Sequence, residues 1–239
     1  MDPKPIPWIV LGWLLCSPGW SLAQGTQSWL ATSVSQNLPH ELDWTVQGQV
    51  RTRSGEFSLG EGIVDVGMGW SPDVLSKWSV DGTCRTRWEY PAEGGWTTGW
   101  RWATSVKWKT SLGDHDLRFR LRHQFGGPWM RPWDRARWRI QGKWTHDLPK
   151  GWKVMPSVET FLGTRWVSSE AGNRSEPTAL RGRLMVDKKW TKRRHVVFGY
   201  QWQSTLNSFP RWHEHTLLVS MDLDLKKAKL GEKRRAASE

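Results

Sequence analysis

The chain has 239 residues, of which 35 are Lys or Arg, 23 are Asp or Glu and 21 are Trp, and its formal net charge is +12. A chain of this length suits a single β-barrel domain. No apolar run reaches the roughly 18 residues that a membrane-spanning helix requires, which excludes a helical membrane protein.

The N-terminal segment has the composition of a secretory signal peptide. Residues Ile6 to Cys16 form a short apolar stretch, and Ser21-Leu22-Ala23 is a small-x-small cleavage site before Gln24. We therefore predict a signal peptide over residues 1–23 and export of the mature protein. Cleavage leaves Cys84 as the single cysteine, so no internal disulfide is expected.

Most of the remaining chain consists of segments of about ten residues in which apolar and polar side chains alternate. Turn-forming residues separate these segments. A period of two places the apolar side chains of a strand on one face and its polar side chains on the other. In chain order the segments cover residues 28–38, 42–52, 62–70, 78–90, 100–109, 117–122, 135–144, 152–166, 180–190, 198–202 and 214–225.

Segment 78–90 shows the alternation most clearly. Trp78 and Trp88 fall on one face, whereas Arg85 and Arg87 fall on the other. An apolar outer face and a charged inner face are typical of a barrel in lipid. Eleven segments are found, although single-chain bacterial barrels normally have an even number of strands.

These patterns predict an all-β fold, a transmembrane antiparallel β-barrel of ten to twelve strands. The barrel is expected over residues 24–225. A charged segment that is poor in apolar side chains follows over residues 226–239, and we predict that it is a basic, disordered tail.

Tryptophan gathers near the ends of the predicted strands. Beside the short turns lie Trp44, Trp70, Trp78, Trp108, Trp144, Trp152 and Trp190. Toward the longer loops lie Trp88, Trp100, Trp102, Trp166 and Trp202. Because an indole ring is apolar but carries one N–H donor, it favours the boundary between lipid and water. We therefore predict two aromatic girdles, one at each membrane interface.

The predicted inner face carries charges of both signs. A basic wall is expected from three consecutive strands: Arg101, Lys107, Lys109, Arg118, Arg120, Arg122, Arg135, Arg137, Arg139 and Lys143. Acidic side chains flank this wall or lie on the closing strand: Glu61, Asp65, Asp81, Glu89, Glu214, Asp222 and Asp224. Opposed walls of opposite sign create a transverse field that selects polar or anionic solutes.

Side chains can fill a barrel this small, and buried charges require partners. A filled or very narrow lumen is therefore favoured over an open pore. The cations on these walls exceed the anions, so a completely paired plug is hard to build. Bound anions, water or the phosphates of lipopolysaccharide would offset the excess.

A membrane-embedded lipid hydrolase or acyltransferase is an alternative function. His213, Glu214, His215 and Ser220 cluster near the end of the chain, and a Ser/His/acid set is the minimum for acyl transfer. Alternation points the two histidines outward and Ser220 inward, so we expect no enzyme and no catalytic residue. No Cys or further His stands at ligand spacing, so neither a metal site nor a cofactor is expected.

Single features of the sequence also suit two other classes of protein. The net positive charge suits a nucleic-acid-binding protein. Export and strict alternation instead place the cations in a lumen or against lipopolysaccharide, so we expect no nucleic-acid partner. A soluble, secreted, Trp-rich carbohydrate-binding β-protein is the third hypothesis, which extraction without detergent would favour.

The segment Gln27-Ser28-Trp29-Leu30-Ala31-Thr32-Ser33-Val34-Ser35 leads into Leu38-Pro39-His40-Glu41-Leu42-Asp43-Trp44. Together with the later strand pattern, these residues resemble an uncharacterised bacterial family, domain of unknown function twenty-four ninety. The likeness covers the chain from Gln27 to Leu225. It implies an outer-membrane β-barrel, because the members of that family are thought to be such barrels. The family has no settled activity and implies no functional residue.

We therefore expect an outer-membrane protein of a Gram-negative bacterium with a passive role. It is either a narrow porin-like channel for polar or anionic solutes or a structural protein of the envelope. Its expected partners are outer-membrane lipid, lipopolysaccharide and, during biogenesis, the barrel-assembly machinery. Six arginines are expected to set any anion preference: Arg118, Arg120, Arg122, Arg135, Arg137 and Arg139.

Overall fold

The computed structural model describes residues 26–52, 58–90, 95–113, 115–128, 135–165, 174–191, 193–206 and 213–225. The predicted signal peptide and the predicted tail lie outside these residues. Within them no helix is long and apolar enough to cross a membrane.

The described residues form eleven strands and two short 3-10 turns. The strands are β1 (Thr26–Asn37), β2 (Leu42–Thr52), β3 (Leu59–Trp70), β4 (Trp78–Glu89), β5 (Thr97–Leu112), β6 (His115–Pro128), β7 (Arg135–Leu148), β8 (Trp152–Arg165), β9 (Arg174–Lys189), β10 (Arg194–Thr205) and β11 (His213–Asp224). The 3-10 turns are η1 (Asp73–Leu75) and η2 (Pro149–Gly151).

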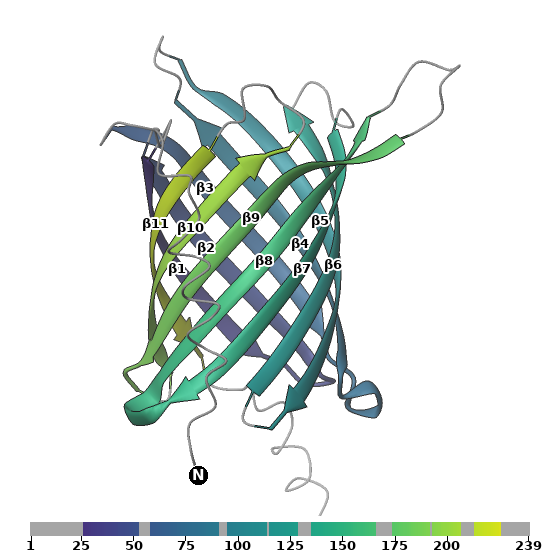
Figure 1. The fold of residues 1–239 in the computed structure, drawn as a ribbon, viewed down its shortest axis with the longest axis vertical. Coiled ribbons are helices and arrows are strands. Elements are labelled where there is room, and N and C mark those ends of the chain that lie inside the picture. Colours follow the sequence, from purple (N-terminus) through teal and green to yellow (C-terminus); the bar gives the residue numbers. More distant parts are fainter. Residues whose placement is uncertain are drawn as a thin grey trace, which may run out of the picture.

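The eleven strands form one closed barrel in which every strand pairs with its neighbours in sequence (Figure 1). The ten consecutive pairs are antiparallel. The closing pair, β1 with β11, is parallel. Strands that alternate in direction around a ring of odd number must leave one pair with the same direction. The structure confirms the predicted all-β barrel and a strand number within the predicted range, and it adds the parallel seam.

The two ends of the barrel differ in the length of their connections. At the lower end of Figure 1 the strands are joined by two to seven residues, including η1 and η2. At the other end they are separated by six to eight residues. We call these the short-turn end and the long-loop end. β1 begins at the long-loop end, and β11 finishes at the short-turn end.

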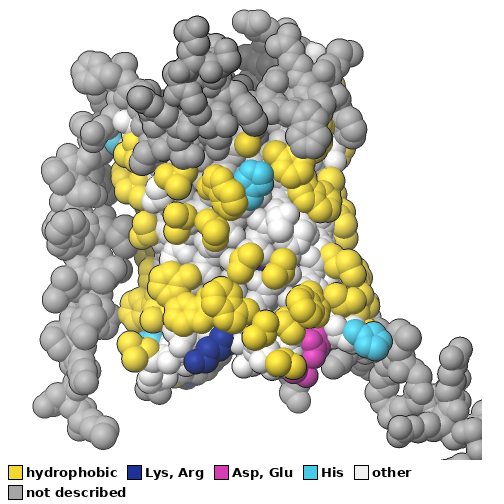
Figure 2. Space-filling view, turned by 90° about the vertical axis from the view of Figure 1, so that its right-hand side faces the viewer, with side chains coloured by type: hydrophobic (Ala, Val, Ile, Leu, Met, Phe, Trp, Pro, Cys, Tyr) yellow, Lys and Arg dark blue, Asp and Glu magenta, His cyan; other side chains and the backbone are white. Residues whose placement is uncertain are grey.

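The barrel is apolar outside and polar inside. Side chains such as Leu30, Val66, Phe119 and Leu217 are exposed on the outer face. Figure 2 shows apolar side chains along one side of the barrel, gathered in bands toward its upper and lower ends. The buried apolar side chains are few: Ile63, Ala103, Phe161, Ala179 and Val197. Most of the buried residues are polar or charged, which is the reverse of a soluble core.

Candidate functional site in the lumen

A cavity of about 460 Å³ lies in the lumen. Ten arginines line it: Arg51, Arg85, Arg87, Arg101, Arg120, Arg122, Arg137, Arg139, Arg181 and Arg183. They come from β2, β4, β5, β6, β7 and β9. β4, β6, β7 and β9 each supply two of these arginines, separated by one residue. Side chains two residues apart in a strand point to the same side, so both arginines of each strand point into the lumen. We call these residues the arginine lining.

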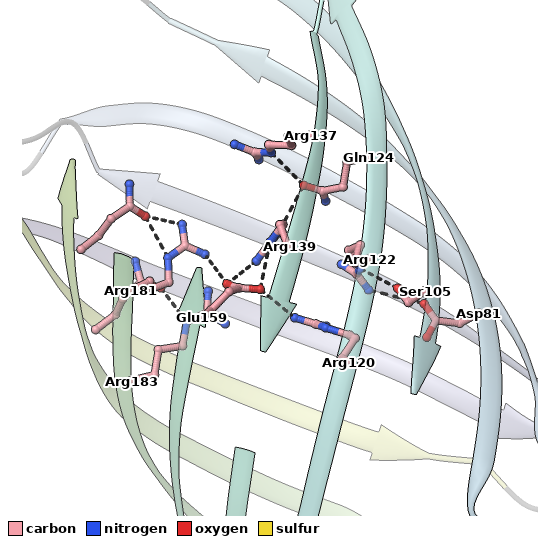
Figure 3. Close-up of polar contacts among 12 residues, drawn as sticks. Asp81, Ser105, Arg120, Arg122, Gln124, Arg137, Arg139, Glu159, Arg181 and Arg183 are labelled. Carbon is pink, nitrogen blue, oxygen red and sulfur yellow. Dashed lines mark hydrogen bonds and ion pairs between the residues drawn. The ribbon is translucent and has the colours of Figure 1, made fainter. Parts of the chain in front are cut away.

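Glu159 of β8 is the centre of the ion pairs in this lining (Figure 3), and it is only 1% exposed. Arg139 of β7 donates to both its carboxylate oxygens, at 2.9 and 2.5 Å. Arg120 of β6 contacts Glu159 Oε1 at 3.1 Å, and Arg181 of β9 contacts Oε2 at 3.3 Å. One carboxylate therefore holds three guanidinium groups from three other strands.

Phe161, the next inward residue of β8, supports the same cluster. The guanidinium carbons of Arg139 and Arg181 lie 4.8 and 4.6 Å from its ring centroid, and that of Arg137 lies at 5.2 Å. A cation over an aromatic face is attracted by the ring quadrupole. The inner edge of β8 therefore provides both a carboxylate and a ring for these arginines.

Carboxylates on β3 and β4 pair with other members of the arginine lining. Asp65 accepts two hydrogen bonds from Arg85, at 2.7 and 2.6 Å, and Glu61 lies 2.9 Å from Arg51. Asp81 lies 3.4 Å from Arg122, which also donates to Ser105 Oγ at 2.7 Å.

Two further arginines bond to neutral amides. Arg183 donates to Gln201 Oε1 at 2.7 Å, and Arg137 donates to Gln124 Oε1 at 2.9 Å. Their charges are therefore not offset by these partners.

The structure divides the residues of the predicted basic wall into two groups. Five line the cavity: Arg101, Arg120, Arg122, Arg137 and Arg139. Four stand nearer the short-turn end and do not line it: Lys107, Lys109, Arg118 and Lys143. Arg135 belongs to β7, but its side chain lies outside the described part of the structure.

Of the remaining predicted acidic residues, Asp222 lines the cavity, whereas Glu89, Glu214 and Asp224 do not. Glu89 pairs with Arg87 at 2.8 Å near the long-loop end, and Glu214 is buried on β11. Asp222 and Asp224 accept hydrogen bonds from Ser33 and Ser35, each at 2.7 Å. These two aspartates therefore join β11 to β1 across the parallel seam.

Several residues of the arginine lining, and the two residues of β8 that contact it, were not predicted as site residues. Arg181 and Arg183 alternate with the apolar Leu180, Gly182 and Leu184, and Glu159 and Phe161 occupy inward positions of β8. The same alternation rule that identified the basic wall finds all four when it is applied to these strands. Arg85 and Arg87 were expected to face inward but were not assigned to the wall.

The residues of the alternative enzyme hypothesis are not brought together. His213 stacks on Trp202, and His215 bonds to the Tyr200 hydroxyl, both on the outer face. Ser220 faces the lumen and donates to Asp222 at 2.9 Å. Among the described residues there is also no group of three His, Cys, Asp or Glu that could hold a metal ion.

The predicted girdle tryptophans stand on the outer face toward the strand ends. Trp78 and Trp108 are opposite each other on β4 and β5 at the short-turn end, with ring centroids 6.5 Å apart. Trp88 and Trp100 lie near the long-loop end of the same strands. The other girdle residues with described positions are Trp44, Trp70, Trp102, Trp144, Trp152, Trp190 and Trp202, whereas Trp166 lies outside the described residues.

Among the described tryptophans, Trp29 faces inward. The guanidinium carbon of Arg51 lies 3.7 Å from the ring centroid of Trp29, which lines the cavity.

A comparison with protein families gives one match over most of the chain. A family model described as Protein of unknown function (DUF2490) matches residues 26–214, which reach from the first residue of β1 into β11. None of the curated proteins matches the chain.

Proposed function

Since the chain belongs to the family described as Protein of unknown function (DUF2490), we propose its function from the physical properties of the barrel. We propose that the protein lies in the outer membrane of a Gram-negative bacterium and forms a narrow passage for small anionic solutes. The observation that carries this proposal is a cavity lined by ten arginines inside a barrel with an apolar outer face.

Three features support insertion in a membrane. Closure of the sheet pairs the strand edges with one another, as the hydrocarbon core requires. The strands have 11 to 16 residues, enough for the roughly 9–11 residues that a tilted strand needs to cross the hydrocarbon core. Exposed apolar side chains continue around the barrel, whereas soluble monomers rarely expose large contiguous apolar patches.

An excess of cations supports selectivity for anions. Six carboxylates line the cavity or pair with its arginines: Glu61, Asp65, Asp81, Glu89, Glu159 and Asp222. Ten arginines outnumber these six carboxylates, so the described residues around the cavity carry a net positive charge. Low-dielectric walls focus such a field and raise the local concentration of anions.

Ion selectivity in planar lipid bilayers tests this proposal. With a KCl gradient, the reversal potential of the purified full-length protein is expected near the chloride equilibrium potential. Replacing Arg122 and Arg183 together by Gln removes two lining charges, so the reversal potential should move toward that of potassium. Arg194→Gln is the matched control, because Arg194 is exposed on the outer face of β10.

Two results would contradict the passage. A wild-type protein that folds and inserts but gives no current would have a closed lumen, which leaves a structural role in the envelope. An equal shift in the Arg194→Gln control would show that surface charge, and not the arginine lining, sets the selectivity.

A further inference from the structure

A second cavity, also about 460 Å³, lies at the long-loop end of the lumen. Arg85, Arg87, Arg101 and Arg137 line both this cavity and the first one. We call these four residues the shared wall. Any solute that enters from the long-loop end reaches the shared wall before it reaches Glu159.

Two arginines of the shared wall lack a carboxylate partner among the described residues. Arg85 and Arg87 pair with Asp65 and with Glu89, respectively. Arg137 bonds to the neutral Gln124, and no hydrogen bond or ion pair joins Arg101 to another described residue. Among the described residues, therefore, no carboxylate is bonded to either of these two guanidinium groups.

The neighbours of Arg101 add to this imbalance. Arg101 stands directly opposite Arg85 in the register of β4 and β5. Arg87 and Arg137 line the same two cavities as this pair. Like charges directly opposite each other destabilise a sheet. An anion between these guanidinium groups would remove the repulsion.

Beside Arg101, two glycines of β6 form part of the wall of the second cavity. Gly126 of β6 pairs with Arg101 and has a φ of +155°. A Cβ at this position would lie 2.3 Å from the carbonyl oxygen of Trp100 and 2.7 Å from the Arg101 Cα, so only glycine fits. Gly126 and Gly127 line the second cavity, so this part of its wall carries no side chains.

We propose that the shared wall binds a dianionic oxyanion of the phosphate type, either inorganic phosphate or the phosphomonoester of a small solute. This inference rests on the proposed anion passage. It assigns the selectivity of that passage to binding at the shared wall. Guanidinium groups donate paired hydrogen bonds that match the oxygens of phosphate. A phosphate monoester carries about −1.5 to −2 charges at neutral pH, which matches the two arginines that have no carboxylate bonded to them within the described part of the chain.

The position of the site also indicates on which side of the membrane the anion binds. In bacterial barrels the longer loops are extracellular and the short turns are periplasmic. The shared wall would therefore bind its anion on the external side of the passage, before the solute meets the arginines around Glu159.

Calorimetric titration of the detergent-solubilised full-length protein tests the site directly. Inorganic phosphate and glycerol phosphate are the two probes, and they distinguish a free anion from an ester. We expect saturable binding with one site per chain. Arg101→Gln and Arg137→Gln should each weaken it by about tenfold or more, since each removes a charge-assisted pair of hydrogen bonds. Arg118→Gln, which lies in the lumen outside both cavities, should leave the affinity unchanged.

Heat-modifiable migration on a gel checks that each variant is folded. If neither probe binds the folded wild type, or if Arg118→Gln weakens binding as much as Arg101→Gln, the site is excluded. Binding of inorganic phosphate alone would show that the site does not accept the ester.

Current block in planar bilayers separates this inference from the proposed passage. Phosphate on the long-loop side should reduce the chloride current of the wild type, and Arg101→Gln should abolish the reduction. A chloride current that phosphate never reduces contradicts the site but keeps the passage. Calorimetric binding without any current contradicts the passage but keeps the site.

Discussion

Glu159 shows how a single side chain can organise a charged interior. It is almost completely buried, and ion pairs with Arg120, Arg139 and Arg181 surround it. A buried charge is stable only when partners replace the water that it has lost. Here the guanidinium groups depend equally on the carboxylate, because they repel one another without it.

Replacing Glu159 by Gln should therefore destabilise the barrel. Loss of one partner from a buried ion pair typically costs about 3–5 kcal/mol. We expect a decrease of this order in the free energy of unfolding, measured by urea titration in lipid vesicles with tryptophan fluorescence. Glu89→Gln is the matched control, since the Glu89 side chain is exposed and its pair with Arg87 should contribute at most about 1 kcal/mol. Equal losses in the two variants would contradict the central role of Glu159.

Among the elements, the pair of β1 and β11 is the one on which closure depends. It is the parallel pair of the barrel, and its register places Ala31 opposite Ser220. Hydrogen bonds from Ser33 to Asp222 and from Ser35 to Asp224 connect the strands on the inner face. Barrel closure removes the two sheet edges that would otherwise pair with other chains.

A cross-link tests this seam. With Cys16 and Cys84 replaced by Ser, the pair Ala31→Cys and Ser220→Cys should form a disulfide on mild oxidation. Paired residues lie within the roughly 4.4–6.8 Å between Cα atoms that a disulfide allows. The product would change the mobility of the unreduced, denatured chain on a gel. Ala31→Cys with Thr216→Cys is the control, because Thr216 pairs with Gln27, four residues away. Efficient cross-linking of the control pair would refute the register.

For the whole molecule, the main prediction concerns the medium around the barrel. Ile140 is 50% exposed in the middle of β7, and Leu112 is 68% exposed at the end of β5. In a bilayer, Arg costs about 2–4 kcal/mol at the midplane of a barrel but only about 0–1 kcal/mol near the interface. In water, both side chains would lie on a wet surface, and Arg would be tolerated at either place.

We therefore expect Ile140→Arg to lower the amount of folded, heat-modifiable protein in the outer-membrane fraction much more than Leu112→Arg does. The free energy of unfolding in lipid vesicles should likewise fall more for Ile140→Arg than for Leu112→Arg. If the two variants behave alike, and the wild type is extracted without detergent, the soluble carbohydrate-binding hypothesis becomes the better one.

Alternation along each strand predicted the barrel and the inward direction of Arg101, Arg120 and Arg139 before any contact was known. This succeeds because the direction of a side chain in a strand is a local property of the pleated backbone. The same rule applied to residues 174–189 would also have found Arg181 and Arg183. The sequence therefore contains a sufficient signal for these two arginines as well.

The sequence by itself determined the strands, their two faces and the excess of cations in the lumen, since all of these follow from neighbouring residues. The tertiary structure alone decided the parallel seam, the grouping of three arginines around Glu159 and the lack of a carboxylate bonded to Arg101 among the described residues. These features depend on the register of strands that are distant in sequence, such as β1 with β11. Register is set by closure of the entire ring, because each strand must satisfy the hydrogen bonds of both its neighbours at once.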